Sequence, residues 1–165
     1  MPSSTEVNAY LLASKQAATG MVWRHSLSRK EVQWWKWESA VGLSGVFPEG
    51  ARVIVQWRPE VGAAQAKINC GIFYRNERVY ALDVDQDGQH TNKVGQGRQL
   101  FGQRIGPGTH EHTWSDDGCG YAEPLPDFEN FSALFAYFCD KANLKVEGGF
   151  KAPPSEQLNL NLPLL

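Results

Sequence analysis

The chain has few cysteines, no long apolar run and no excess of basic residues, and each shortage excludes a class of protein. Its cysteines are Cys70, Cys119 and Cys139, an odd number without the paired spacing of a metal finger. A reducing compartment keeps such thiols free, so we expect them in or near the core. No stretch approaches the roughly 18 consecutive apolar residues that indicate a membrane-spanning helix.

Net charge gives no sign of general nucleic-acid binding. Sixteen Lys and Arg residues stand against eighteen Asp and Glu residues, which gives a formal charge of −2. Any site for a polyanion must therefore be a local patch. The first residues lack the charged start and apolar run of a secretory signal. We expect a cytoplasmic protein with no membrane partner, and the sequence does not predict an oligomeric state.

Length and hydrophobic content are those of one domain. The chain has 165 residues, 42% of them hydrophobic, which suffices for a core that buries about 70% of the unfolded surface. We expect a single domain over 1–165. Residues 148–155 contain two prolines, which interrupt regular structure. In 158–162, apolar and polar residues alternate as in a short strand. We predict that 148–165 form a flexible tail, or one that pairs with a sheet edge or a partner subunit.

Two segments have a helical pattern. Ser3 and Glu6 can form a capping box, and apolar residues recur at helical spacing from Val7 until Gly20. Near the C-terminus, Asp127 suits the N-cap of a second helix. This helix has phenylalanines at a spacing of 3.6 residues, which predicts a buried face made of Phe128, Phe131, Phe135 and Phe138.

The rest of the chain predicts a largely antiparallel sheet. Five segments are rich in β-favouring residues, namely 21–27, 32–37, 52–57, 66–74 and 78–84. Short polar connections between them, such as Ser28-Arg29-Lys30 and Arg75-Asn76-Glu77, predict tight turns. We therefore predict an α+β fold, with an N-terminal helix and a C-terminal aromatic helix packed on the sheet.

Trp34, Trp35 and Trp37 form a dense group of indoles in one of these segments. Indole rings can stack on nucleic-acid bases, which would suit a binding surface. Adjacent residues of a strand face opposite sides of the sheet, so at least one of the three should enter the core. We expect these tryptophans to serve mainly in the packing of the core rather than in ligand stacking.

Three of the four histidines fall within one short region of the chain, at His90, His110 and His112. His110 and His112 are two residues apart, so on a strand their imidazoles project to the same face. The preceding strand places Asp83 and Asp85 on one face as well. Such a group suits two ligands on one metal ion, or two imidazoles that bracket a phosphate, although isolated surface histidines are the simpler alternative.

The segment between His90 and His110 is rich in glycine, glutamine and arginine. It lacks the Gly-Lys-Ser/Thr of a P-loop. A mobile loop here could wrap a phosphate backbone, with Lys93, Arg98 and Arg104 as counter-charges, while a solvated hairpin loop is an equally good interpretation.

The same region has a fixed order of motifs: an Asp-containing strand end, a histidine shortly after it, and His-x-His on the next strand. The segments are 82–85, Gly88, 90–92, 108–112 and 121–125, followed by the aromatic helix. From about Tyr80 to Leu144 this order resembles a group of small uncharacterised bacterial proteins that are similar to the TumE-type toxins of toxin–antitoxin operons. The resemblance implies a bacterial α+β toxin that acts on RNA, with an antitoxin protein as a partner. It also implies that Asp83 or Asp85, with the three histidines, forms the site.

For the reaction we expect metal-free cleavage of RNA phosphodiester bonds. One of His110 and His112 would act as the base on the ribose 2′-hydroxyl, and another histidine as the acid on the leaving oxygen. Lys93, Arg98 or Arg104 would neutralise the charge of the phosphorane.

Two alternatives stay open. The protein could be a divalent-metal hydrolase, with zinc or manganese held by His90, His110, His112 and Asp85. It could also be a non-catalytic binding module, such as a phage- or defence-related inhibitor of a protein partner.

Overall fold

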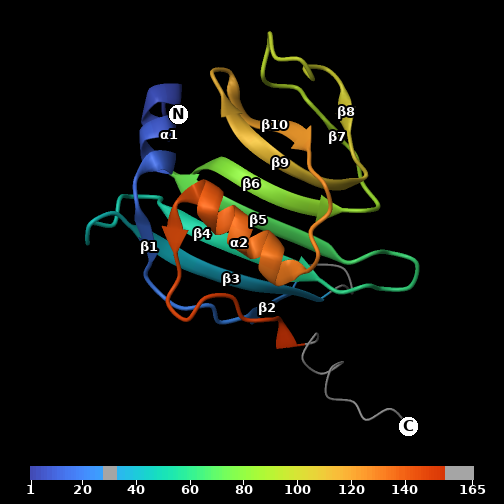
Figure 1. The fold of residues 1–165 in the computed structure, drawn as a ribbon, viewed down its shortest axis with the longest axis horizontal. Helices are drawn as coiled ribbons and strands as arrows, with labels where there is room; N and C mark the ends of the chain where they lie inside the picture. The colour runs from blue at the N-terminus through green and yellow to red at the C-terminus, as the bar shows by residue number, and fades with distance from the viewer. Residues whose placement is uncertain (28–32, 155–165) are drawn as a thin grey trace.

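The computed structural model describes residues 1–27 and 33–154, and these form an α+β protein with a curved, mostly antiparallel sheet (Figure 1). The described residues build nine strands in the order β10-β9-β6-β5-β4-β3-β1-β11, with β2 paired to β3. Only β1 and β11 run parallel within this described sheet. The strands are β1 (Lys15–Ala17), β2 (Arg24–Leu27), β3 (Gln33–Gly42), β4 (Arg52–Arg58), β5 (Lys67–Tyr74), β6 (Glu77–Asp85), β9 (Gly108–Ser115), β10 (Gly118–Pro124) and β11 (Leu144–Lys145).

The central hairpins follow the sequence pattern. In β4, every second residue is buried, at Val53, Val55 and Trp57, as expected for a strand with one face on a core. Arg75 and Asn76 connect β5 to β6 with φ of 50° and 66°, the backbone that a two-residue hairpin turn requires. The predicted turn is therefore confirmed, whereas the predicted turn at 28–30 lies outside the described residues.

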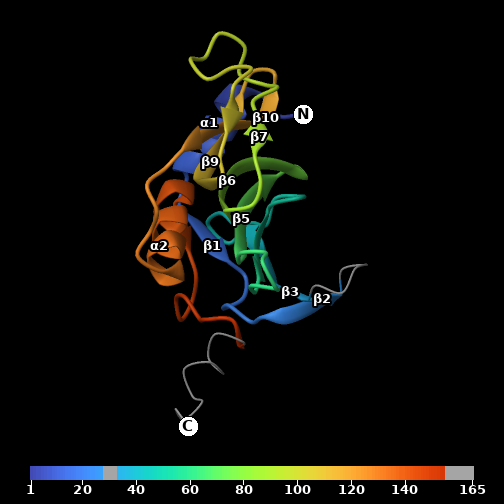
Figure 2. The same ribbon diagram turned by 90° about the vertical axis from the view of Figure 1, so that its right-hand side faces the viewer.

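Helix α2 (Phe131–Ala142) lies across one face of the sheet (Figures 1 and 2). Phe131, Phe135 and Phe138 are buried in the core, and Phe128 precedes the helix and is only partly buried. The prediction of Asp127 as the N-cap is wrong, because the Asn130 side chain accepts the Ala133 backbone N–H and begins the helix three residues later.

Helix α1 (Ser4–Leu12) has the predicted capping box of Ser3 and Glu6. The prediction that it continues to Gly20 is wrong. The chain leaves the helix after Leu12, and β1 then pairs with both β3 and β11. Lys15 fixes this exit, because its ammonium group donates hydrogen bonds to three backbone carbonyls at the end of α1, those of Tyr10, Leu11 and Ala13.

The tryptophans divide between the two faces of the sheet, as predicted. Trp37 is buried and its ring packs edge-on against Phe135. Trp34 lies on the opposite face, with the Arg58 guanidinium 5.9 Å from its ring centre. At least one indole therefore serves the core.

The predicted strand at 21–27 is shorter in the structure, where β2 begins at Arg24, and the predicted strand at 32–37 extends to Gly42 within the described residues. Phe150, in the described part of the expected tail, packs against Phe131 and Phe135. The predicted strand at 158–162 lies outside the described residues. Among the helices that the structure describes, none is long and apolar enough to cross a membrane.

The sheet face that α2 does not cover is called the open face below. One in-register row of polar residues crosses it from β3 to β9, and consists of Lys36, Gln56, Asn69, Asp83 and His110. The connection between β6 and β9, residues 86–107, is called the excursion below. It contains a separate two-stranded sheet of β7 (His90–Thr91) and β8 (Arg104–Ile105) (Figure 1). This excursion brings a third histidine to the end of the polar row.

Candidate functional site

Four side chains from three strands meet at the β6 and β9 end of the open face. Asp83 stands on β6, His110 and His112 on β9, and His90 on β7. Asp83 is opposite His110 in the ladder, and the small Ala81 is opposite His112. Because His110 and His112 are two residues apart, both rings project to the same side, as the sequence predicts.

The three imidazoles lie close together, and the His112 ring contacts both of the others. The ring centres of His110 and His112 are 4.9 Å apart, those of His90 and His112 are 4.8 Å apart, and those of His90 and His110 are 6.4 Å apart. His110 and His112 are 5% and 4% exposed, whereas His90 is half-buried. The alternative of isolated surface histidines is therefore wrong for His110 and His112, which are buried. We call His90, His110, His112 and Asp83 the histidine cluster.

Backbone carbonyls orient all three rings. His90 Nε2 lies 2.8 Å and His112 Nδ1 3.4 Å from the Gly120 carbonyl oxygen, and His110 Nδ1 lies 3.1 Å from the Gly108 carbonyl oxygen. A carbonyl only accepts hydrogen bonds, so His90 Nε2 and His110 Nδ1 are donors, and in the neutral ring the other nitrogen of each carries the lone pair. His112 differs, because both of its nitrogens face acceptors: Nδ1 faces the Gly120 carbonyl and Nε2 lies 3.1 Å from Asp83 Oδ2.

Gly120 reaches two histidines because it lies in a bulge. The β9–β10 register shifts between Cys119 and Tyr121, which leaves Gly120 as the extra residue. Its φ of 105° is a conformation that favours glycine. The carbonyl is thereby turned out of the ladder, where it accepts from both rings.

Asp83 supplies the buried carboxylate of the cluster. Its Oδ2 lies 3.1 Å from His112 Nε2, and its buried Oδ1 has no hydrogen-bond partner among the described residues. Burial by itself raises the pKa of Asp83, but the hydrogen bond and charge of His112, the Asn69 amide and the Arg78 charge together bring this pKa below its usual value. Asp83 is therefore ionised at neutral pH.

The environment disfavours protonation of two of the histidines. Burial lowers the pKa of His90 and of His110, and the neighbouring charge of His112 lowers both further. Neutral imidazoles are the form that binds metal ions. One donor atom each from Asp83, His110 and His112 lies within 4.8 Å of the others. Small side-chain rotations would bring them to the separation of about 3.4 Å that a tetrahedral ion with 2.1 Å bonds requires.

Asp85 does not join the cluster, contrary to the metal-site expectation that included it. Lys67 stands opposite Asp85 in the ladder, and its ammonium nitrogen lies 2.9 Å from Asp85 Oδ2. The other carboxylate oxygen, Oδ1, accepts the Asp87 backbone N–H. Asp83 is therefore the carboxylate that the structure places at the histidines.

Arg98 is not free to act as a counter-charge to a substrate, contrary to the sequence expectation. Its guanidinium carbon stands 3.5 Å from the centre of the Tyr121 ring. Nη1 donates to the Thr113 and Ser115 hydroxyls at 2.9 and 3.1 Å, and Nη2 lies 3.6 Å from a Glu123 carboxylate oxygen. Arg98 therefore fastens the excursion to β9 and β10.

The other two expected cations are exposed. Arg104 pairs with Thr91 in the β7–β8 ladder, whereas His90 pairs with Ile105. Since side chains alternate along a strand, Arg104 faces away from His90. Lys93 is exposed just beyond β7.

Asn92 is a structural residue of the site that the sequence analysis missed. It is buried, its amide oxygen accepts the Ala122 backbone N–H at 2.6 Å, and its amide nitrogen donates to the Ala122 and Leu100 carbonyls. It holds the strand of His90 against β10. Its place beside His90 in the sequence was the only available signal.

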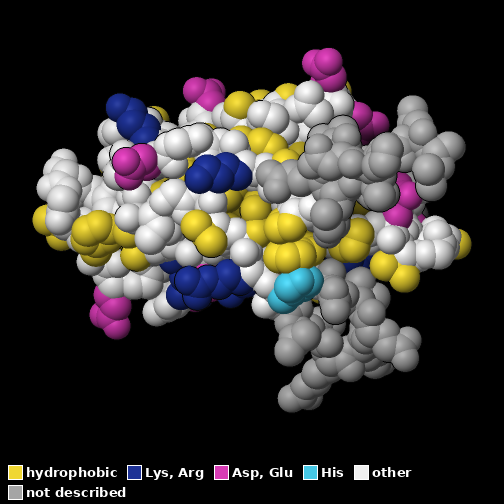
Figure 3. Space-filling view, turned by 90° about the horizontal axis from the view of Figure 1, so that it is seen from below, with side chains coloured by type: hydrophobic (Ala, Val, Ile, Leu, Met, Phe, Trp, Pro, Cys, Tyr) yellow, Lys and Arg dark blue, Asp and Glu magenta, His cyan; other side chains and the backbone are white. Residues whose placement is uncertain are grey.

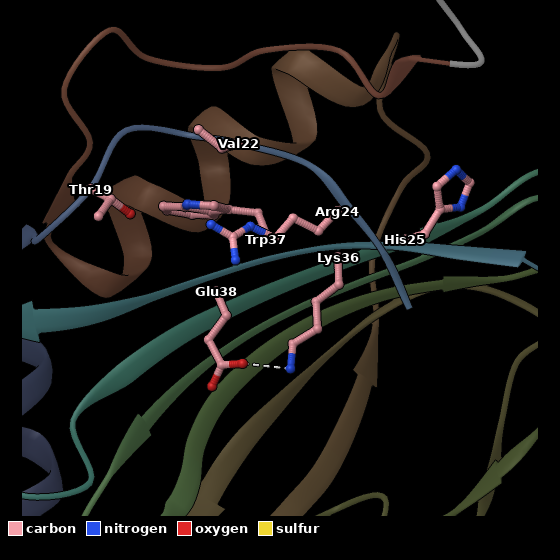
Figure 4. Close-up of a pocket in the computed structure, with 7 residues that line it drawn as sticks. All are labelled: Thr19, Val22, Arg24, His25, Lys36, Trp37 and Glu38. Carbon is pink, nitrogen blue, oxygen red and sulfur yellow. Dashed lines mark ion pairs between the residues drawn. The ribbon is translucent and has the colours of Figure 1, made fainter. Parts of the chain in front are cut away.

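A separate hollow of about 540 Å³ lies beside β2 and β3, on the lower edge of the molecule. Lys and Arg side chains and a histidine lie there beside hydrophobic side chains (Figure 3). Its lining includes Arg24, His25, Trp37 and the ion pair of Lys36 with Glu38 (Figure 4). His25 is the histidine that stands outside the cluster. The hollow has no buried group of ligating side chains among the described residues.

The comparisons with known proteins give no relative. The chain matches no family model, no curated protein and no solved structure. The resemblance to TumE-type toxins therefore stays an expectation, and function rests on the arrangement of the described residues.

Proposed function

We propose that the histidine cluster binds a divalent transition-metal ion, zinc or manganese, and that the protein is a metal-dependent hydrolase. One observation carries this proposal: single donor atoms of Asp83, His110 and His112 lie within 4.8 Å of one another, and a backbone carbonyl faces the Nδ1 of both histidines. Metal-ligating histidines are commonly oriented in this way, because the second nitrogen is then directed at the ion. The buried carboxylate of Asp83 supplies negative charge at the same place.

The geometry favours this proposal over metal-free acid–base catalysis. A phosphate group cannot lie between His110 and His112, whose ring centres are 4.9 Å apart, because each ring and the phosphate need their own van der Waals space. Metal-free ribonuclease activity, RNA as the substrate and an antitoxin partner stay predictions from the sequence.

Asp83, His110 and His112 provide three ligands, the number typical of catalytic zinc sites with an open fourth position. A bound divalent ion would supply Lewis acidity and lower the pKa of a water ligand. His90 Nε2 is held by Gly120, so its Nδ1 carries the lone pair and can accept a proton from an attacking water. The half-buried position of His90 places it at the accessible side of the cluster.

Metal binding by purified protein tests the proposal. Elemental analysis and zinc titration should give one ion per chain, and a His110→Ala/His112→Ala double variant should lose it. His25→Ala is the matched control, because His25 packs against Trp35 outside the cluster, and it should retain the metal. Failure of zinc and manganese to bind well-folded protein would refute the metal site.

Activity is tested separately with RNA and with simple phosphate esters. Hydrolysis should depend on the added metal and stop on chelation. RNA cleavage that survives EDTA and leaves 2′,3′-cyclic phosphate ends would instead support the metal-free mechanism predicted from the sequence.

A further inference from the structure

A small hollow lies on the open face directly beside the histidine cluster. It has a volume of about 70 Å³, and its lining includes Gln56, Asn69, Arg78 and Asp83 together with Gly71 and Phe73. A water molecule occupies about 30 Å³ of liquid, so the hollow has room for one compact polar group. Asp83 belongs both to this hollow and to the cluster.

Arg78 reaches this position because Gly71 has no side chain. A Cβ atom built on Gly71 would stand 3.4 Å from Arg78 Cδ and 3.7 Å from Arg78 Cγ. The aliphatic stem of Arg78 therefore lies over Gly71 on the open face. The positive charge contributes to the low pKa values of Asp83 and His90, which agrees with a guanidinium close to the cluster.

Arg78 has no ion-pair partner among the described residues. Arg24 and Arg104 also have none in the described chain but are exposed, whereas carboxylates lie within 4.0 Å of Arg52, Arg58, Arg75 and Arg98. Arg78 is half-buried, and none of its guanidinium nitrogens is among the buried side-chain atoms without a partner in the described chain, so the guanidinium is open to solvent or to a ligand. The geometry leaves its hydrogen-bonding fork for a ligand.

The unpaired Arg78 guanidinium, with the Asn69 and Gln56 amides around the same hollow, leads us to propose a phosphate-binding subsite beside the histidine cluster. All three side chains offer N–H donors, and the guanidinium fork matches two phosphate oxygens. The charge of Asp83 is engaged by His112 at 3.1 Å, so it opposes an incoming anion less than a free carboxylate would.

This subsite deepens the proposed function, on which it rests, by naming the substrate class. A phosphate held at Arg78 lies next to Asp83, which is one of the three proposed metal ligands. The substrate is then a phosphate ester whose phosphorus lies beside the metal centre. Phosphodiesters of RNA belong to this class.

Calorimetric titration with inorganic phosphate tests the subsite independently of the metal. The protein as purified, and the same protein after EDTA treatment, should both bind phosphate. Arg78→Gln should weaken binding by about 10- to 100-fold, the equivalent of one or two charge-assisted hydrogen bonds. Arg78→Lys, which keeps the charge but loses the fork, should give an intermediate loss.

Arg75→Gln is the matched control, because Arg75 is exposed in the turn that precedes β6 and pairs with Glu6. It should leave phosphate binding unchanged, and circular dichroism verifies the fold of each variant. Equal loss in Arg75→Gln, no phosphate binding by the folded protein, or tighter binding of acetate than of phosphate would overturn the subsite. Zinc binding without phosphate binding would remove only the subsite, and phosphate binding without metal binding would remove only the proposed metal function.

Discussion

His112 Nε2 lies 3.1 Å from Asp83 Oδ2, although the two residues are not opposite each other in the β6–β9 ladder. Asp83 is opposite His110, so its contact with His112 is a diagonal one across the two strands. Both side chains are almost fully buried. The pair therefore links the proposed chemistry of the open face to the stability of the sheet.

Asp83→Asn should lower the free energy of unfolding by about 3–5 kcal/mol, the usual result when one partner of a buried charged pair is removed. Asp85→Asn is the control two residues away on the same strand. Its pair with Lys67 is only partly buried, so its loss should cost about 1 kcal/mol or less. Urea denaturation of metal-free protein measures both. Equal losses would mean that Asp83 is not specially coupled to His112.

Stability of the metal-free protein should fall as the solution is acidified from pH 7.5 to 5.5. In the unfolded chain, histidine titrates near 6.5, whereas burial lowers the folded-state pKa values of His90 and His110. The unfolded state then binds more protons, so stability is complete above pH 6.5 and is lost as the pH falls towards the lowered folded values. Denaturation in EDTA across this range measures the loss.

A His90→Gln/His110→Gln variant should have a weaker dependence of stability on pH over the same range. His25→Gln controls for loss of a histidine outside the cluster. The low pKa values of Asp83 and Asp85 affect stability only at lower pH, so they do not contribute here. A pH dependence that survives in the double variant would assign it to other groups.

The sequence pattern predicted the strands and helices that bury one face in the core. The β-favouring residues at 52–57 predicted β4, and the 3.6-residue spacing predicted most of α2. The ends of the helices depended on other contacts. Asn130 begins α2 in place of Asp127, and Lys15 joins the end of α1 to β1. A local sequence pattern does not show such contacts, because the backbone groups that meet at a helix end come together only in the folded chain.

The sequence predicted the candidate site only in part, as it did the fold. The two-residue spacing of His110 and His112 places them on one face of any strand. The Gly120 carbonyl that orients two rings depends on a bulge in a different strand. Arg78 is similarly placed by the absence of a side chain at Gly71. These relationships join strands across the sheet, so spacing along the chain could not reveal them.

Phe135→Ala should lower the free energy of unfolding by about 3–5 kcal/mol, because it removes a buried ring and leaves a cavity. Phe135 is 3% exposed and its ring contacts those of Trp37, Phe138 and Phe150. Phe101→Ala is the matched control, since Phe101 is 43% exposed. Chemical denaturation should show a much smaller effect for the control. A loss below about 1 kcal/mol at Phe135 would contradict the packing of α2.

Arg98→Gln should act on stability and not on phosphate binding. The substitution removes a cation–π contact with Tyr121, worth about 0.5–2 kcal/mol, and hydrogen bonds to two hydroxyls, each worth about 1 kcal/mol. The expected loss in the free energy of unfolding is therefore about 2.5–4 kcal/mol. Arg104→Gln is the control, because Arg104 is exposed on β8, and it should have little effect. Denaturation measures both, and faster chymotrypsin cleavage near Phe101 should show that the excursion has loosened. If stability is unchanged and the binding of RNA or phosphate is weakened, the result would instead support the substrate-binding role of Arg98 that the sequence predicts.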